Sequence, residues 1–122
     1  MTKEKIKYIL KILPYAIKLI KEGKTEATFY ENNHSKTIVV DNEVRAVLEI
    51  VDELIANEKP DSWVMKILLG YKKGKRDIAI IMNAPVSRAT YYSVKASLVN
   101  KIYDCCVYKG LVPYKNIINE EV

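Results

Sequence analysis

The sequence predicts a mainly α-helical domain with a C-terminal helix-turn-helix and one small β-hairpin. Three observations support this fold class. Apolar residues recur at spacings of three and four along most of the 122-residue chain, which is the period of an amphipathic helix. With only 4 glycines and 4 prolines, long irregular loops are few. One stretch, residues 26–40, instead combines strand-forming residues with a polar turn.

The first apolar stripe predicts a helix over residues 3–22. Pro14 interrupts it, because proline removes one helical hydrogen bond and clashes with the preceding turn. Two outcomes stay open: a kinked helix, or a short first helix with a second one beginning near Pro14. Gly23 supplies a C-terminal stop. The stripe consists of Ile6, Ile9, Leu10, Leu13, Ile17 and Ile20.

Residues 26–40 have the composition of a hairpin. Residues 28–30 and 37–40 have strong strand propensity, and the polar residues 31–36 between them favour a turn. A small β-hairpin is the prediction. A mobile loop is the alternative, because an isolated hairpin is only marginally stable.

Two helices follow the hairpin. One runs to about Asn57, with Asp41 or Asn42 as its cap. The next begins at Pro60-Asp61-Ser62 and ends between Gly70 and Gly74. The apolar face of the first is Val44, Val47, Leu48, Val51, Leu54 and Ile55, and the second is expected to bury Trp63 or Val64, Ile67, Leu68 and Tyr71.

A short helix over about residues 76–82 and a long one from Ser87 to about Tyr108 complete the fold. Asn83-Ala84-Pro85 separates the two helices, and Ser87 is the expected cap of the second. Gly110 and Pro113 end the long helix. Its apolar face is predicted to contain Tyr91, Val94, Leu98, Ile102 and Cys105.

The positive charge is concentrated in one segment. The chain has a formal net charge of +5, but residues 1–60 hold 10 basic and 10 acidic side chains. Residues 61–115 carry +7, and residues 116–122 carry −2. A local excess of this size with interspersed tyrosines suits a polyanion surface, whereas a chance fluctuation in a lysine-rich chain is the alternative.

Two helices joined by a tight turn in this basic segment form a helix-turn-helix pattern, whose second helix enters the major groove of DNA with its N-terminal residues. The guanidinium of Arg88 can pair with guanine, and Ala89 and the Thr90 methyl can contact a thymine methyl. Ser87 can cap the helix and present its first amides to a phosphate. The candidate DNA-binding residues of this helix are Ser87, Arg88, Ala89, Thr90, Tyr92, Ser93 and Lys95. Backbone contacts are expected from Lys72, Lys73, Lys75 and Arg76.

Residues 64–108 carry a resemblance to a known family, and residues 87–92 (Ser-Arg-Ala-Thr-Tyr-Tyr) are its most specific element. The segment resembles the DNA-binding part of RinA/ArpU-type phage regulators, which are similar to the fourth conserved region of bacterial sigma factors. The usual Ile-Ala pair of that region aligns either with Ile78-Ala79, two residues further from Ser87 than in that region, or with Ile80-Ile81, which places Ile where Ala is usual. The resemblance implies a phage or prophage protein that activates late genes. It implies that Arg88, Ala89, Thr90, Tyr92 and Lys95 face the groove.

We therefore expect a sequence-specific DNA-binding transcription regulator without enzymatic activity. Its expected partners are double-stranded DNA, a second copy of the chain and RNA polymerase. Residues 1–60 would form a helical assembly or partner region with the hairpin at 26–40 as its preferred surface, residues 61–110 would bind DNA, and residues 111–122 would form a tail. The alternatives are a small terminase-like DNA-packaging subunit and a protein-only binder of the transcription machinery.

The sequence contains few residues suited to catalysis or metal binding. One histidine, His34, and two cysteines cannot supply the four ligands of a zinc module, and no cofactor is expected. The acidic cluster at residues 49–58 is interpreted as a solvated helix face. Cys105 is expected to be buried and Cys106 exposed, both reduced. No apolar run approaches the roughly 20 residues of a membrane span and no secretory signal is evident, so we expect a soluble, cytoplasmic protein.

Overall fold

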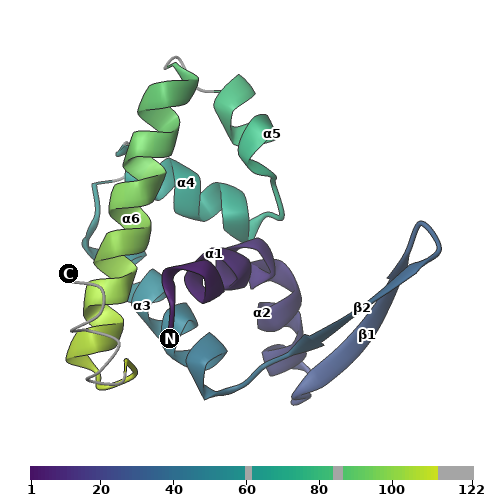
Figure 1. The fold of residues 1–122 in the computed structure, drawn as a ribbon. Coiled ribbons are helices and arrows are strands. Elements are labelled where there is room, and N and C mark those ends of the chain that lie inside the picture. The colour runs from purple at the N-terminus through teal and green to yellow at the C-terminus, as the bar shows by residue number, and fades with distance from the viewer. Residues whose placement is uncertain (60–61, 84–86, 113–122) are drawn as a thin grey trace.

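The computed structural model describes residues 1–59, 62–83 and 87–112, and within these ranges it is mainly helical with one two-stranded antiparallel sheet (Figure 1). This confirms the predicted fold class. The helices are α1 (Lys3–Lys11), α2 (Leu13–Lys21), α3 (Asn42–Asn57), α4 (Trp63–Lys72), α5 (Asp77–Met82) and α6 (Arg88–Tyr108), and the strands are β1 (Glu26–Glu31) and β2 (His34–Val39).

The first apolar stripe forms two helices rather than one kinked helix. Pro14 lies in the first turn of α2, where a missing amide hydrogen costs no helical hydrogen bond. The break changes the phase of the stripe, so Ile17 and Ile20 are only partly buried. The second helix instead buries Leu13, Ala16 and Leu19.

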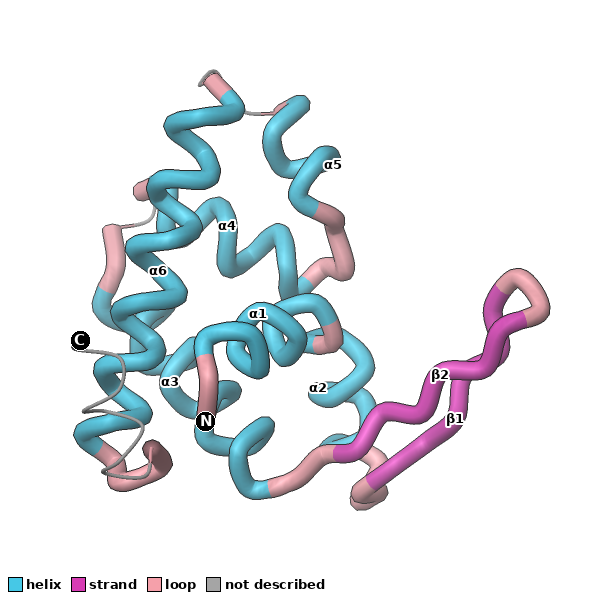
Figure 2. Tube along the Cα trace, in the orientation of Figure 1, coloured by secondary structure: helices cyan, strands magenta, loops and turns pink. Residues whose placement is uncertain are grey.

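The hairpin forms as predicted, with a tighter turn than expected. Asn32 and Asn33 both have positive φ, 50° and 65°, which matches the twist of the flanking strands in a two-residue turn. The strands therefore extend to Glu31 and His34, and Thr28 faces Thr37 across the pair. Figure 2 shows the hairpin as an arm that projects from the helices.

The base of the hairpin is anchored in the helical body. Ile38 is fully buried, and the Phe29 ring lies 4.8 Å from the ring of Tyr15 on α2, centroid to centroid. The outer part of the arm is exposed, including Tyr30 at 83%. The arm therefore has a fixed base and an exposed tip.

One hydrophobic core connects both halves of the chain. Helix α6 packs against α1, α3 and α4, and the buried side chains of all these helices form a single cluster. Residues 1–60 and 61–110 thus share this core in the described part of the chain. The two halves therefore pack against each other instead of forming separate cores.

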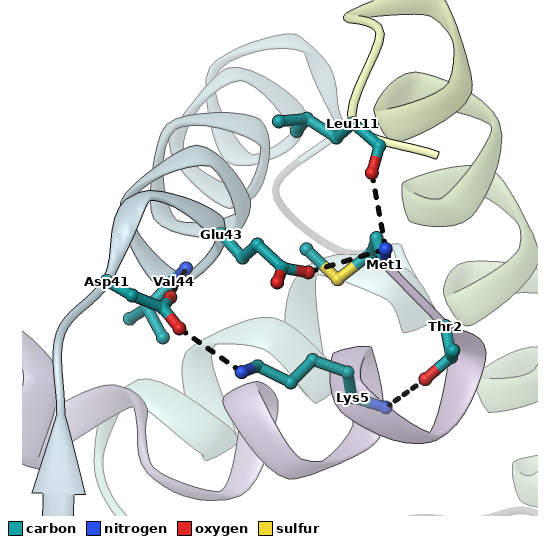
Figure 3. Close-up of polar contacts among 7 residues, drawn as sticks. All are labelled: Met1, Thr2, Lys5, Asp41, Glu43, Val44 and Leu111. Atoms are coloured by element: carbon teal, nitrogen blue, oxygen red, sulfur yellow. Dashed lines mark hydrogen bonds and ion pairs between the residues drawn. The ribbon is translucent and has the colours of Figure 1, made fainter. Parts of the chain in front are cut away.

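Polar contacts tie the start of the chain to α3 and to the end of α6 (Figure 3). The Met1 amine donates a hydrogen bond to the Leu111 carbonyl, 3.2 Å away, and lies 3.5 Å from the Glu43 carboxylate. The Lys5 ammonium lies 3.3 Å from Asp41, which caps α3 as one of the two predicted candidates. These contacts fix where α1 begins relative to α3.

Two burial predictions were wrong. Cys106 is fully buried and Cys105 is partly exposed, because the face of α6 toward its neighbours follows Val99, Ile102 and Cys106. Trp63 is only partly buried and does not belong to the core. It is the first residue of α4 and borders a surface depression, where the Lys66 ammonium lies 4.7 Å from its ring centroid.

Gly70 allows α5 to pack closely against α4. A Cβ atom at Gly70 would lie 2.7 Å from Cδ1 of Ile80, which is 7% exposed. Ile78, two residues earlier, is 57% exposed. The missing side chain of Gly70 therefore provides the space that Ile80 fills. This contact sets the separation of α4 and α5.

We expect Gly70→Ala to destabilise the wild-type protein by about 1 kcal/mol, because the clash outweighs the gain in helix propensity. In an Ile80→Ala background the nearest retained atom, the Cβ at position 80, lies 4.0 Å away, an ordinary contact. There the same substitution should stabilise by about 1 kcal/mol. Urea unfolding of the four proteins measures this coupling, and an equal effect in both backgrounds would contradict it.

Candidate nucleic-acid interface

The first two turns of α6 form an exposed ridge. Ser87 caps the helix as predicted, since its Oγ accepts a hydrogen bond from the Thr90 amide at 3.2 Å. The two hydroxyls of this pair are also 2.9 Å apart. Tyr91 is 1% exposed and belongs to the core, as predicted. The exposed side chains around it are Arg88, Ala89, Thr90, Tyr92 and Ser93.

A carboxylate at the start of α5 connects three helices beneath this ridge. Asp77 accepts hydrogen bonds from the Tyr71 hydroxyl of α4 and, at 2.7 Å, from the Tyr91 hydroxyl of α6. Its other oxygen lies 2.8 Å from the ammonium of Lys95 on α6. The side chains of Asp77 and Lys95 are 20% and 12% exposed. This Asp77 cluster fixes the orientation of α6 relative to α4 and α5.

The cluster also sets the protonation states of its members. Burial alone would raise the pKa of Asp77, but the hydrogen bonds from Lys95, Tyr71 and Tyr91 outweigh it, so the pKa lies below its ordinary value of 3.8. Burial, together with the bond to Asp77, raises the pKa of Tyr71 and Tyr91 above the ordinary 10. Asp77 is therefore an anion and both tyrosines are neutral donors throughout the physiological range.

Two of the predicted DNA contacts form ion pairs with carboxylates of the same chain. Lys95, expected to face the groove, instead gives its ammonium to Asp77, because its position one turn after Tyr91 lies on the inner side of α6. Lys72, an expected backbone contact, lies 3.0 Å from Asp52 of α3. The Lys95–Asp77 pair connects α6 to α5, the Lys72–Asp52 pair is exposed, and Ser87 combines its capping role with an exposed position.

A groove of about 550 Å³ separates the exposed ridge from the N-terminal helices. Asp77 is the single acid among the described residues that line it, and its charge is already paired. Tyr15, Tyr71 and Tyr92 contribute aromatic rings. The basic side chains of the lining are Lys11, Lys36, Lys75, Arg76 and Arg88, and we call this surface the basic groove.

The predicted cluster of turn lysines divides between two surfaces. Lys75 and Arg76 line the basic groove, as does Arg88. Lys73 and Trp63 line a separate surface depression. Lys75 lines both this depression and the basic groove. The turn after α4 thus directs only part of its charge toward the ridge.

The sequence does not predict that Lys11 and Lys36 belong to this surface. Lys11 ends α1 and Lys36 lies in β2, in the half of the chain whose charges balance. No linear pattern relates either residue to the segment at 72–95. The only signal was that Lys11 falls off the apolar stripe, which marks a residue as exposed but does not say what lies beside it.

The chain matches no known protein-family model, no curated protein and no solved structure. The resemblance to RinA/ArpU-type regulators therefore stays a prediction from residues 64–108. In the described ranges no helix combines the length and apolar character that a membrane crossing requires. The same ranges contain no group of three or more His, Cys, Asp or Glu side chains suited to a metal ion.

We expect Asp77→Asn to lower the free energy of unfolding by about 2 kcal/mol, because Lys95 loses its counter-charge in a site with little water. Urea unfolding near pH 7 measures the loss. The matched control is Asp52→Asn, whose exposed pair with Lys72 contributes less than about 1 kcal/mol. Equal losses in the two variants would show that Asp77 contributes no more to stability than a residue in an exposed ion pair.

The difference in unfolding free energy between wild type and Asp77→Asn should become smaller as the solution becomes more acidic. Because the folded pKa of Asp77 is below the unfolded value of about 3.8, its contribution is complete above that value. The contribution is lost as the pH falls through the folded pKa. Unfolding curves of both proteins at several pH values test this, and a difference that persists undiminished in strong acid would rule out the ionised carboxylate as its source.

Proposed function

We propose that this protein is a sequence-specific DNA-binding transcription regulator in which the first two turns of α6 enter the major groove. The observation that supports this most strongly is the position of the exposed ridge beside the basic groove. None of the five basic side chains that line this groove forms an ion pair within the described residues. An exposed helix end beside unpaired positive charge is the arrangement by which a helix is docked on DNA.

The ridge offers side chains suited to reading base edges. The major groove is about 12 Å wide and admits a helix. Arg88 can donate two hydrogen bonds to a guanine, and Ala89 and the Thr90 methyl can contact the methyl group of a thymine. Tyr92, 44% exposed, and Ser93 lie further along and can contact bases or sugar-phosphate. Each good base contact contributes about 1–3 kcal/mol of discrimination.

The Asp77 cluster supports this function by orienting the ridge in advance. Tyr71 and Lys95 hold α6 to α4 and α5 through one carboxylate, so docking need not order these helices. A surface that is already in its bound arrangement loses less entropy on binding. Lys95 is therefore proposed as a positioning residue rather than a base contact.

The proposal extends to the origin of the protein and to its assembly. The resemblance of residues 64–108 favours a phage or prophage activator that contacts RNA polymerase at promoters. A single small module binds weakly, so a symmetric homodimer that reads two half-sites is the favoured assembly. The projecting hairpin, with Tyr30 at 83% exposure, is the candidate surface for that contact.

We expect Arg88→Ala to weaken binding to the protein's own operator by roughly 5- to 150-fold, the equivalent of about 1–3 kcal/mol. Binding to an unrelated duplex should change far less. The operator is first selected from genomic fragments at near-physiological salt, and both affinities are then measured by fluorescence anisotropy.

The matched control is Arg45→Ala on α3, an exposed arginine that does not line the basic groove. It should leave both affinities within about twofold of wild type, on the order of the ±0.5 kcal/mol of a neutral surface change. Equal losses on operator and unrelated DNA for Arg88→Ala would remove it from base reading. Failure of the wild-type protein to enrich any fragment would overturn the proposal and favour a protein-only partner.

A further inference from the structure

We infer that the basic groove holds one phosphodiester strand of the duplex that α6 reads, so that Lys11 and Lys36 of the N-terminal half are DNA-binding residues. This inference rests on the proposed function and adds a second, sequence-independent contact surface to it. It also gives residues 1–60 a direct part in DNA binding, in addition to assembly.

The charges of the groove converge from four separate elements. Lys11 comes from the end of α1, Lys36 from β2, Lys75 and Arg76 from the turn before α5, and Arg88 from the first turn of α6. All five are exposed. Like charges gathered around one concavity repel each other and lower stability. A polyanion in the groove relieves this repulsion and releases its own condensed counterions.

Some other basic residues of the protein form ion pairs. Lys5, Lys72 and Lys109 each lie within 3.7 Å of a carboxylate, on Asp41, Asp52 and Glu53 respectively. Within the described residues, no such pair involves a basic side chain of the groove. The N-terminal half has a balanced charge overall, yet it brings Lys11 and Lys36 to the groove, and none of its acids is among the lining residues. Within the described residues neither lysine forms an ion pair, although the Lys36 ammonium lies 5.7 Å from the centroid of the Tyr8 ring.

The acid in the groove does not oppose a bound phosphate. Asp77 forms an ion pair with the Lys95 ammonium, 2.8 Å away, and accepts hydrogen bonds from Tyr71 and Tyr91. Its charge is thus neutralised at the groove wall. The net charge that a ligand meets is strongly positive, and the nearby Tyr15 and Tyr92 bring hydroxyl groups, which are common phosphate donors in DNA complexes.

The position of Arg88 connects the groove to the ridge. Arg88 and Tyr92 line the groove and also belong to the exposed first turns of α6. A strand lying in the groove would therefore run beside the bases that α6 contacts, as the backbone flanks the major groove. The occupant that fits both surfaces is one strand of a duplex, rather than an isolated single strand.

The test is the salt dependence of DNA affinity for the double variant Lys11→Ala/Lys36→Ala. Because this variant lacks two ammonium groups that would each neutralise one phosphate, the slope of log K against log salt should become less negative by about 1.8. The change should be the same on the operator and on an unrelated duplex, so the ratio of the two affinities stays at its wild-type value. Far-ultraviolet circular dichroism checks that this pair of exposed substitutions leaves the helices intact.

The matched control is Lys101→Ala/Lys109→Ala, which removes the same net charge from the other end of α6, where both lysines face carboxylates. Its slope should stay at the wild-type value. Equal slope changes in the two double variants would overturn the inference, because overall charge alone would then explain the effect. A change seen with single-stranded DNA but not with a duplex would overturn it as well.

The Arg88 and Lys11/Lys36 variants distinguish a failure of the groove contact from a failure of the sequence-specific regulator. If Arg88→Ala abolishes operator preference while Lys11→Ala/Lys36→Ala leaves every slope unchanged, the regulator stands and the groove contact falls. If the wild-type protein binds no duplex even at low salt, both fall together. A normal slope change without any preferred sequence would retain the groove contact and overturn the specific regulator.

Discussion

Helix α6 buries one face against α1, α3 and α4, and this contact joins the two halves of the chain in one core. Each large apolar side chain buried there contributes about 1.5–3 kcal/mol, and six of the 21 residues of α6 are buried. In its first two turns Tyr91 still packs in the core, whereas Arg88, Ala89, Thr90, Tyr92 and Ser93 are exposed. The same helix therefore anchors the fold at one end and offers the candidate interface at the other, and neither can shift without the other.

The Asp77 cluster shows how a polar group within the fold can be used for orientation. An ion pair with little solvent around it adds little net stability, because desolvation offsets the attraction between the charges. Its geometric requirement is strict, however, since Asp77 must meet Tyr71, Tyr91 and Lys95 at once. Gly70 adds a second constraint by setting how closely α5 approaches α4. Together they define the angle at which α6 leaves the body of the protein.

Charge in this protein is organised in space and not only along the chain. Residues 61–115 carry the excess that first indicated a polyanion partner, yet Lys72 and Lys95 from that segment form ion pairs with Asp52 and Asp77. Lys11 and Lys36, from the half without net charge, lie at the basic groove instead. Net charge per segment therefore indicated a class of partner that can be proposed, but it does not show which charged side chains lie on the same surface.

The sequence by itself determined the local elements. Helix starts at Asp41 and Ser87 and the break at Pro14 depend on hydrogen bonds and steric contacts within about four residues, so the sequence contains all the partners that decide them. The tertiary structure decided which face of α6 is buried, which carboxylate binds Lys95, and that Lys11 and Lys36 face the same groove. These outcomes depend on the crossing of helices far apart in the chain, and a difference of one residue around a helix, about 100°, is enough to exchange a buried side chain for an exposed one.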